Sequence, residues 1–330
     1  MTAPLPDAAP PVLFVHPGPH GVAVYAREIA AEVVRERADA RITTPDTLVA
    51  LPAGTAVHAH VTDRLWGASP EEATRAVVGL AARHPLTVTL HDVPQASDGE
   101  RNRPRRRAFY REVTAAARAV AVNSAHEREL LREEDVWHGD VAVIPLPVDE
   151  RPVAPAPSDD AVGVLGYFYP GKGHDEALAA AVEAGMSRVT VLGRASEGHA
   201  ADLDAFVRRA DAAGVQVEVT GWLDDDEMAA RVARVAVPVI AHRHVSASGS
   251  LTSWIGWGRR PVAVRNRYVD EMAALRPGTL SVVEPEQLAP AISAARVDAA
   301  TTWHGISALP AGRADATAAY LRWWSGVSRR

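Results

Sequence analysis

The loop that begins at Gly166 has the residue types of a phosphate-binding turn. It reads Gly166-Tyr-Phe-Tyr-Pro-Gly-Lys172-Gly173 and lies between an apolar run, residues 161–165, and a segment of helix type that starts at Asp175. Free backbone N–H groups and the positive end of a helix attract an anion, and Lys172 adds a full charge. It is not a G-x-x-x-x-G-K-[ST] loop, because Gly173 stands where that loop has serine or threonine. The alternative is an ordinary strand–turn–helix connection with a surface lysine.

A second candidate anion site follows the apolar run at residues 236–241. Ser246, Ser248 and Ser250 surround Gly249, and Leu251 belongs to the apolar helix that is expected to follow. Such a helix start offers several N–H and O–H donors. The alternative is a serine-capped helix without a ligand. Because both loops follow strands, we interpret them together as a clamp for a diphosphate.

The first half of the chain has a histidine where a strand is expected to end. His91 and Asp92 follow the apolar run 87–90, and a histidine there can hydrogen-bond a polar substrate or transfer a proton near neutral pH. A purely structural histidine is the alternative. His58 and His60 lie two apart on another expected strand, but no further ligand cluster has suitable spacing, so we predict no metal site.

The loop after the first apolar run contains Gly18, His20 and Gly21. Two glycines between a strand and a helix allow the backbone to approach a substrate closely. The G-x-G-x-x-G spacing of a dinucleotide site is missing. The alternative is a tight turn without a ligand.

Arg105 lies in a run of five arginines within residues 101–107. Guanidinium groups bind phosphate in a bidentate manner, so the run fits recognition of an anionic acceptor. Such runs are more often a solvated helix start. Both interpretations stay open from the sequence.

Short Val-, Ile- and Leu-rich runs alternate with longer Ala-, Arg- and Glu-rich segments along the chain. We expect strands at residues 12–16, 56–60, 87–91, 119–123, 141–145, 162–166, 188–192, 215–220, 236–241 and 261–264. We expect helices at residues 22–35, 70–83, 105–117, 125–134, 175–184, 201–213, 225–234, 250–257, 285–295 and 314–325. Apolar strands separated by helices predict an α/β fold with parallel sheets covered on both faces.

A proline-rich stretch divides the chain, with five prolines in residues 145–157. Because prolines end regular structure, we predict two doubly wound Rossmann-like domains, residues 1–150 and 151–312. Ligands of such sheets lie beyond the carboxyl ends of the strands, so a cleft between the two domains is expected. Residues 313–330 are expected to form a helix that crosses back to the first domain.

Composition narrows the function classes. The chain has 330 residues, a formal net charge of −6, 47% hydrophobic residues and no cysteine, which excludes disulfides and thiolate metal sites. The net charge gives no general reason to expect a nucleic-acid partner. No apolar run approaches the roughly 20 residues that span a bilayer, and no signal peptide is recognised, so a soluble cytoplasmic protein is expected.

The second half resembles the GT-B glycosyltransferases, in particular the retaining type of family 4. The loop with Lys172 resembles the family's donor-phosphate loop, in which Lys172 matches the family lysine and Tyr167 stands in place of an arginine. Residues 246–254 fall on the family's Glu-x7-Glu region with Gly249 at its glycine. Ser246 and Trp254 replace the two glutamates, of which the second holds the nucleotide ribose in the family.

The first half resembles the same family more loosely. Residues 18–21 resemble its glycine-rich first loop, and His91 resembles the cleft histidine that contacts the donor sugar. The resemblance implies a GT-B fold and catalytic roles for His91 and Lys172. It also implies a donor site with Gly21, Tyr167, Ser246, Ser248, Gly249, Ser250 and Leu251, and an acceptor side with Gly18, His20, Asp92 and Arg105.

The expected activity is therefore transfer of a sugar from a nucleoside-diphosphate sugar to an acceptor hydroxyl on a small molecule, a lipid or a glycan. Retention of configuration and independence from metal and other cofactors follow from the resemblance. The missing glutamates leave two alternatives, a non-catalytic GT-B-like ligand-binding or partner subunit and a nucleotide-sugar epimerase.

Overall fold

The computed structural model describes residues 9–328, and these residues form two compact units. Unit 1 comprises the chain up to Pro147 together with the segment from Ala311, and unit 2 is Val148–Pro310. The proline-rich stretch has no helix and runs along unit 2, where the Arg151 amide donates to the Gly256 carbonyl at 2.8 Å. The predicted boundaries were residues 150 and 312.

Unit 1 contains a parallel sheet of six strands in the order β2-β1-β3-β4-β5-β6. The strands are β1 (Val12–Phe14), β2 (Ile42–Thr43), β3 (Val57–Val61), β4 (Leu86–Leu90), β5 (Ala119–Val122) and β6 (Val141–Val143). The helices are α1 (Gly21–Glu36), α2 (Pro45–Leu48), α3 (Asp63–Trp66), α4 (Pro70–Arg83), α5 (Gly99–Ala116), α6 (Ala125–Glu133) and α13 (Arg313–Ser328), with a short 3-10 turn, η1 (Ala96–Asp98).

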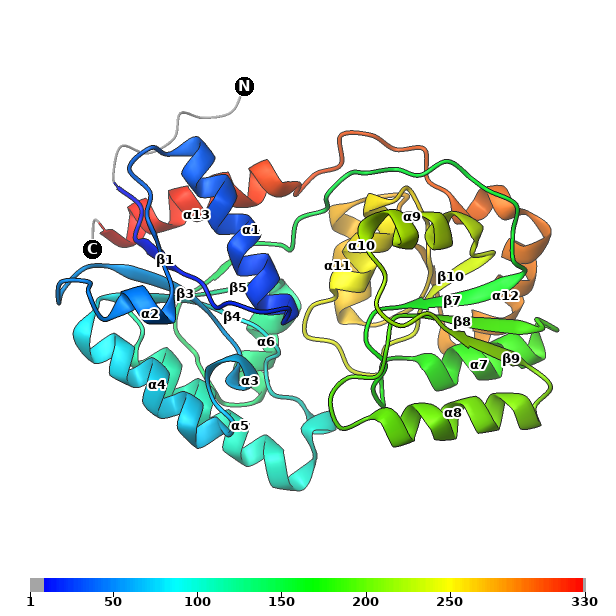
Figure 1. The fold of residues 1–330 in the computed structure, drawn as a ribbon, viewed down its shortest axis with the longest axis horizontal. Helices are drawn as coiled ribbons and strands as arrows, with labels where there is room; N and C mark the ends of the chain where they lie inside the picture. The colour runs from blue at the N-terminus through cyan, green and yellow to red at the C-terminus, as the bar shows by residue number, and fades with distance from the viewer. Residues whose placement is uncertain (1–8, 329–330) are drawn as a thin grey trace. The chain divides into compact units, whose positions relative to one another are not determined.

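The two faces of the unit 1 sheet are covered by different kinds of packing. Helices α4, α5 and α6 form an apolar core with one face, and α1 and α13 cover the other (Figure 1). The second face also carries His58 and His60 on β3 and Thr89 on β4, all of them buried. The Thr89 hydroxyl lies 3.0 Å from the Tyr320 hydroxyl on α13, so polar contacts join this helix to the sheet.

Unit 2 repeats the architecture with the order β12-β11-β10-β7-β8-β9, again all parallel. The strands are β7 (Ala161–Leu165), β8 (Arg188–Leu192), β9 (Gln216–Val219), β10 (Val237–Ile240), β11 (Val262–Val264) and β12 (Ser281–Val283). The helices are α7 (His174–Glu183), α8 (Ala200–Ala212), α9 (Asp225–Arg234), α10 (Gly249–Gly256), α11 (Arg267–Leu275) and α12 (Leu288–Val297), with 3-10 turns η2 (Pro285–Gln287) and η3 (Ala299–Thr302).

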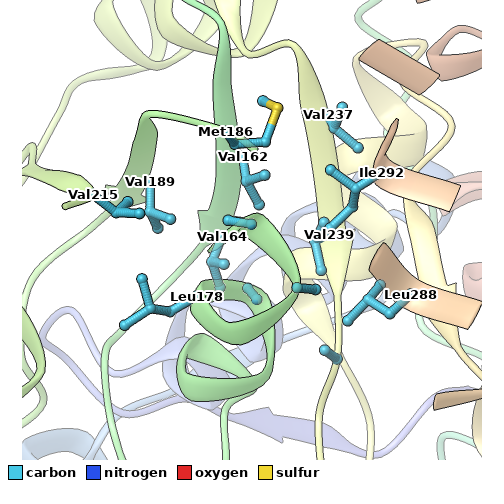
Figure 2. Close-up of a cluster of buried hydrophobic side chains, with 14 of the residues drawn as sticks. Val162, Val164, Leu178, Met186, Val189, Val215, Val237, Val239, Leu288 and Ile292 are labelled. Carbon is cyan, nitrogen blue, oxygen red and sulfur yellow. The ribbon is translucent and has the colours of Figure 1, made fainter. Parts of the chain in front are cut away.

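Both faces of this sheet are apolar. Valines of β7, β8 and β10 pack against α7, α8 and α12, and Figure 2 shows Val162 and Val239 of the sheet near Leu178 and Ile292. Helices α9, α10 and α11 cover the other face, where Trp254 is fully buried. The sheet reverses its strand order between β7 and β10. Loops that leave two such strands diverge and open a crevice for ligands.

The structure confirms the predicted α/β class with parallel sheets and corrects some element boundaries. The helix predicted from residue 105 begins at Gly99, with Pro104 inside it. Arg103 binds Glu134, and Arg106 binds Asp98, so ion pairs hold the added turns in place of the backbone bond that the proline cannot make. The sequence analysis also missed β2, β12, α2, α3 and α11.

Residues 9–328 contain no helix that is both long enough and apolar enough to cross a membrane.

Candidate functional site

The loop between β7 and α7 is held in place by glycine contacts that no other residue could make. A Cβ on Gly193, after β8, would lie 2.2 Å from the Gly166 carbonyl oxygen. One on Gly173 would lie 2.5 Å from the backbone of Ala241, after β10. Both glycines have positive φ, which disfavours a side chain. The ends of three neighbouring strands therefore meet at this loop.

Lys172 is a buried cation without a buried anion. Its side chain is 8% exposed, and its ammonium nitrogen donates to the Ser250 hydroxyl at 3.0 Å and lies 5.8 Å from the centroid of the Tyr169 ring. Within residues 9–328 no carboxylate pairs with it. Burial lowers the pKa of Lys172 from 10.5 to about 8, so the group is still mostly charged at neutral pH. It is also the only lysine of the chain.

The start of α10 supplies hydroxyl and amide groups beside this lysine. Ser248 caps the helix, and its hydroxyl oxygen accepts from the Leu251 amide at 3.2 Å. The Ser248 and Ser250 hydroxyls lie 3.0 Å apart, and the Ser248 amide donates to the Tyr268 hydroxyl at 3.0 Å. Gly249 is the first residue of the helix. The structure thus brings Lys172, Ser248, Gly249 and Ser250 together, while the cap occupies the Leu251 amide.

Ser246, Trp254 and Tyr167 lie at different depths around this cluster. Ser246 is buried in the loop between β10 and α10. Trp254 is fully buried in the core below α10, so its ring does not face solvent. The Tyr167 ring is partly exposed, and the guanidinium carbon of Arg194 lies 5.8 Å from its centroid.

Two buried histidines near Lys172 were not singled out by the sequence analysis. The pKa of His174 is lowered to about 3, and that of His242 lies well below its usual value, by burial first and by Lys172 second. Neither ring nitrogen of His174 has a partner among residues 9–328. Lys172 is therefore the charged member of the group. Both histidines are visible in the sequence, but their proximity to Lys172 depends on how the strand ends meet in the fold.

In unit 1, His91 lies at the carboxyl end of β4 as predicted from the sequence. Its Nε2 lies 3.0 Å from Nδ1 of His60, so one imidazole donates to the other. Burial lowers the pKa of His91 to about 4 and that of His60 well below its usual value, which keeps both rings neutral near pH 7. The Tyr110 hydroxyl donates to the His91 carbonyl oxygen, and Asp92 has a φ of 52°.

The loop between β1 and α1 contains the other predicted residues of unit 1. His20 caps α1, where its Nδ1 accepts from the Val22 amide at 3.2 Å, and Gly21 is the first residue of the helix. The Gly18 and Gly21 positions have open space around them. Tyr25 of α1 reaches to 5.6 Å from the His91 ring, so this loop and His91 belong to one edge of the sheet.

Arg105 already has a partner. Its guanidinium binds Glu71 of α4 with nitrogen-to-oxygen distances of 2.7 and 2.6 Å, and both side chains are exposed. Arg103 and Arg106 of the same run bind Glu134 and Asp98. The run lies in the first turns of α5, which agrees with the alternative interpretation as a helix start, and three of its arginines form ion pairs there.

One hollow of unit 2 lies away from all of these residues. It has a volume of about 900 Å³ and is bordered by Arg188, Gln216 and Arg231. Arg188 and Gln216 begin β8 and β9, so the hollow is at the amino ends of the strands, opposite to the edge where parallel sheets bind ligands. The described residues contain no group of three or more His, Cys, Asp or Glu side chains placed to hold a metal.

No family model matches the sequence, and no curated protein sequence matches it. The solved structures that are similar in fold include the three that follow. Sucrose-phosphate synthase from Thermosynechococcus elongatus has a TM-score of 0.69 at 16% identity over 97% of this chain and 96% of its own. HepE from Anabaena, in complex with UDP and glucose, has a TM-score of 0.65 at 14% identity over 93% of this chain and 94% of its own.

The third structure is a much longer protein. A single-residue mutant of S. aureus TarM, in complex with fondaparinux, alpha-GlcNAc-glycerol and UDP, has a TM-score of 0.53 at 11% identity over 74% of this chain. The match spans 47% of the TarM chain. At these identities the likeness establishes the fold, and the chain has the GT-B fold with two six-stranded parallel sheets.

Proposed function

We propose that the protein is a glycosyltransferase that moves a sugar from a nucleoside-diphosphate sugar to an acceptor hydroxyl on a small molecule, a lipid or a glycan. The observation that carries the proposal is Lys172, a buried ammonium group that donates to a serine hydroxyl, lies near an aromatic ring and pairs with no carboxylate within residues 9–328. An uncompensated buried charge is costly, so it calls for an anion that arrives with a ligand.

The surroundings of Lys172 match a diphosphate in particular. The group lies where the sheet of unit 2 reverses its strand order, beside the amide-bearing start of α10. Helix starts and lysines are recurring phosphate ligands. HepE and TarM, which have the same fold, were solved with UDP bound. We assign the donor nucleotide to unit 2 and the acceptor side to unit 1.

In this mechanism the enzyme stabilises the leaving group. Negative charge develops on the diphosphate as the glycosidic bond breaks, and Lys172 with the Ser250 and Gly249 donors would offset it. His91, held neutral and hydrogen-bonded to His60, can offer a ring nitrogen to a sugar hydroxyl. The leaving phosphate would take the proton of the acceptor hydroxyl, so no separate base is required.

We further propose membership in the retaining family 4, transfer with retention and activity without metal. Lys172 and the start of α10 would supply the electrostatic stabilisation that a metal gives elsewhere. The ribose must be held differently from the family pattern, because Trp254 replaces the glutamate and is buried in the core. Activity that survives EDTA would support independence from metal, and activity lost in EDTA and restored by a divalent cation would contradict it.

A non-catalytic nucleotide-binding subunit is the second candidate. It is favoured by Ser246 and Trp254, which leave both glutamate positions without a carboxylate. Isothermal titration with UDP, GDP and TDP, followed by assays of the matching sugar nucleotides with candidate acceptors, separates the two. Binding with turnover supports the transferase, and binding without turnover on any acceptor supports the second candidate.

The decisive variant is Lys172→Ala. We expect it to lower kcat by about a hundredfold or more, because a preorganised charge at the leaving group is removed. Arg188→Gln, at the opposite end of β8, removes a positive charge without touching the site and should leave kcat unchanged. Unchanged turnover in Lys172→Ala would contradict the assignment.

A further inference from the structure

Arg194 lies over two aromatic rings at the edge of unit 2 that carries Lys172. Its guanidinium carbon lies 5.8 Å from the centroid of the Tyr167 ring and 5.8 Å from that of the Trp222 ring. The three residues come from the loops after β7, β8 and β9. An arginine over two rings is restricted in orientation and loses less entropy when it binds a ligand.

The charge of Arg194 is not neutralised within residues 9–328. No carboxylate of the described chain pairs with it, although arginines elsewhere in unit 2 are paired, among them Arg209 with Asp175 and Arg231 with Glu218. The side chain is also exposed. A positioned, exposed and unpaired guanidinium is a ready partner for an anionic ligand, since it can bind phosphate oxygens in a bidentate manner.

Backbone contacts connect Arg194 to the lysine site. Gly193, the preceding residue, packs so closely on Gly166 that its Cβ would lie 2.2 Å from the Gly166 carbonyl oxygen. A Cβ on Gly166 would in turn lie 3.6 Å from the Lys172 ammonium nitrogen. The backbone next to Arg194 therefore packs on Gly166, and the Lys172 ammonium group lies beside the same glycine.

We infer that Arg194 is the second cation of the diphosphate site and takes the role of the arginine that Tyr167 replaces. In this arrangement the positive charge lies in the loop after β8, and the ring of Tyr167, which stands where the resembled family has an arginine, supports the guanidinium. The ligand class is the diphosphate of a nucleotide sugar. This inference rests on the proposed function.

The test compares nucleoside diphosphates with nucleosides by isothermal titration at fixed ionic strength. Arg194→Gln should weaken binding of UDP, GDP or TDP by about tenfold or more, as expected for loss of a charged hydrogen-bonding partner, and should leave the matching nucleoside unaffected. Arg188→Gln, which removes a charge at the other end of the same strand, is the matched control and should bind the diphosphates like the wild type.

A double variant places the positive charge at position 167, where the resembled family has its arginine. Tyr167→Arg combined with Arg194→Gln should restore the diphosphate affinity to within about threefold of the wild type. A purely structural role of Arg194 in joining the loops would not be rescued in this way. Thermal unfolding of every variant separates loss of binding from loss of the fold.

The remaining outcomes identify which statement fails. A wild type that binds none of the three diphosphates overturns the proposed function and this inference together. A wild type that binds, with an unchanged affinity in Arg194→Gln, overturns only the role of Arg194. An equal loss for the diphosphate and the nucleoside, or a double variant without rescue, also overturns the assignment of Arg194 to the phosphates.

Discussion

The loops after β1 and β7 both lie where their sheet reverses its strand order, but they differ in electrostatic character. The loop in unit 1 carries His16 and His20, and burial, with His20 as a second cause, lowers the pKa of His16 to about 4. The loop in unit 2 carries Lys172, whose pKa of about 8 leaves it mostly charged at pH 7. One topology thus provides a neutral, hydrogen-bonding edge in one unit and a cationic edge in the other.

The difference extends beyond the loops. In unit 1, buried imidazoles continue along the sheet through His58, His60 and His91, none of which has a buried carboxylate as its hydrogen-bond partner in the described residues. In unit 2 both sheet faces are apolar, and Lys172 lies with the serine hydroxyls of α10 at the strand ends. Under the proposed function, unit 1 would bind neutral hydroxyls of sugars and acceptors, and unit 2 would bind phosphates.

As the pH falls, unit 1 should lose stability before unit 2 does. Folding lowers the pKa of His58 to about 3 and of His91 to about 4, from 6.5. The unfolded chain binds more protons between these values, so this stability is complete above pH 6.5 and is lost as the pH falls toward 4. At pH 5 each such histidine costs about 2 kcal/mol. Hydrogen exchange of β3 and β4, compared with β7, at pH 7 and pH 5 measures the effect.

Unit 2 has fewer such histidines, His174 and His242, so acid should lower its stability less. Its strands should therefore keep their protection from hydrogen exchange to a lower pH. His58→Gln should flatten the pH dependence of the stability of unit 1. Earlier loss of protection in β7 than in β3 would show that the buried imidazoles of unit 1 do not limit its stability.

Replacement of a glycine by alanine should destabilise the protein more at the strand ends of unit 2 than at those of unit 1. Gly193→Ala places a Cβ 2.2 Å from the Gly166 carbonyl oxygen, where only backbone could move away. We expect a loss of about 4 kcal/mol in the free energy of unfolding, the range of severe single substitutions. Urea unfolding followed by circular dichroism measures it.

The matched substitution in unit 1 is Gly18→Ala. Gly18 has a φ of 89° but nothing within 4 Å of its Cβ position, so only backbone strain of about 1–2 kcal/mol is expected. Similar losses for the two alanine variants would mean that the close packing of the strand ends in unit 2 contributes little to stability.

The sequence predicted the sheets well because buried parallel strands are continuous apolar runs, as in residues 161–165. It missed β2 and β12, which are short edge strands of two and three residues with too little pattern to detect. Helix α11 was missed although Asn266 caps it and Val269 and Met272 are buried on one face, a signal that was available.

The candidate site was only partly predictable. Lys172 and Ser248–Ser250 could be paired from the sequence, because both segments follow strands and the carboxyl ends of parallel strands share one edge. Arg194 could not be found in this way, since its contacts with Tyr167 and Trp222 depend on the order of β7, β8 and β9. The run that contains Arg105 attracted attention by charge, and the structure gives it ion-pair partners.

The last prediction concerns the free-energy cost of the buried charge of Lys172 in the protein without ligand. Folding lowers the pKa of this group from 10.5 to about 8, so the folded state disfavours the ammonium form. The resulting loss of stability is present below pH 8 and is relieved as the pH rises toward 10.5. Lys172→Met should therefore stabilise the free protein at pH 7 by about 3 kcal/mol while it abolishes diphosphate binding.

Two measurements test whether the Lys172 charge destabilises the free protein and is required for diphosphate binding. Thermal unfolding should show Lys172→Met above the wild type at pH 7, with the gap closing toward pH 10, because the unfolded lysine then loses its charge as well. Since Lys172 is the only lysine, selective ¹³C labelling of lysine gives one side-chain signal whose titration reports its pKa directly. Bound UDP should raise that pKa, since a nearby anion favours the ammonium form. A free-protein titration near 10.5, with no stabilisation in Lys172→Met, would remove the electrostatic contrast between the two loops.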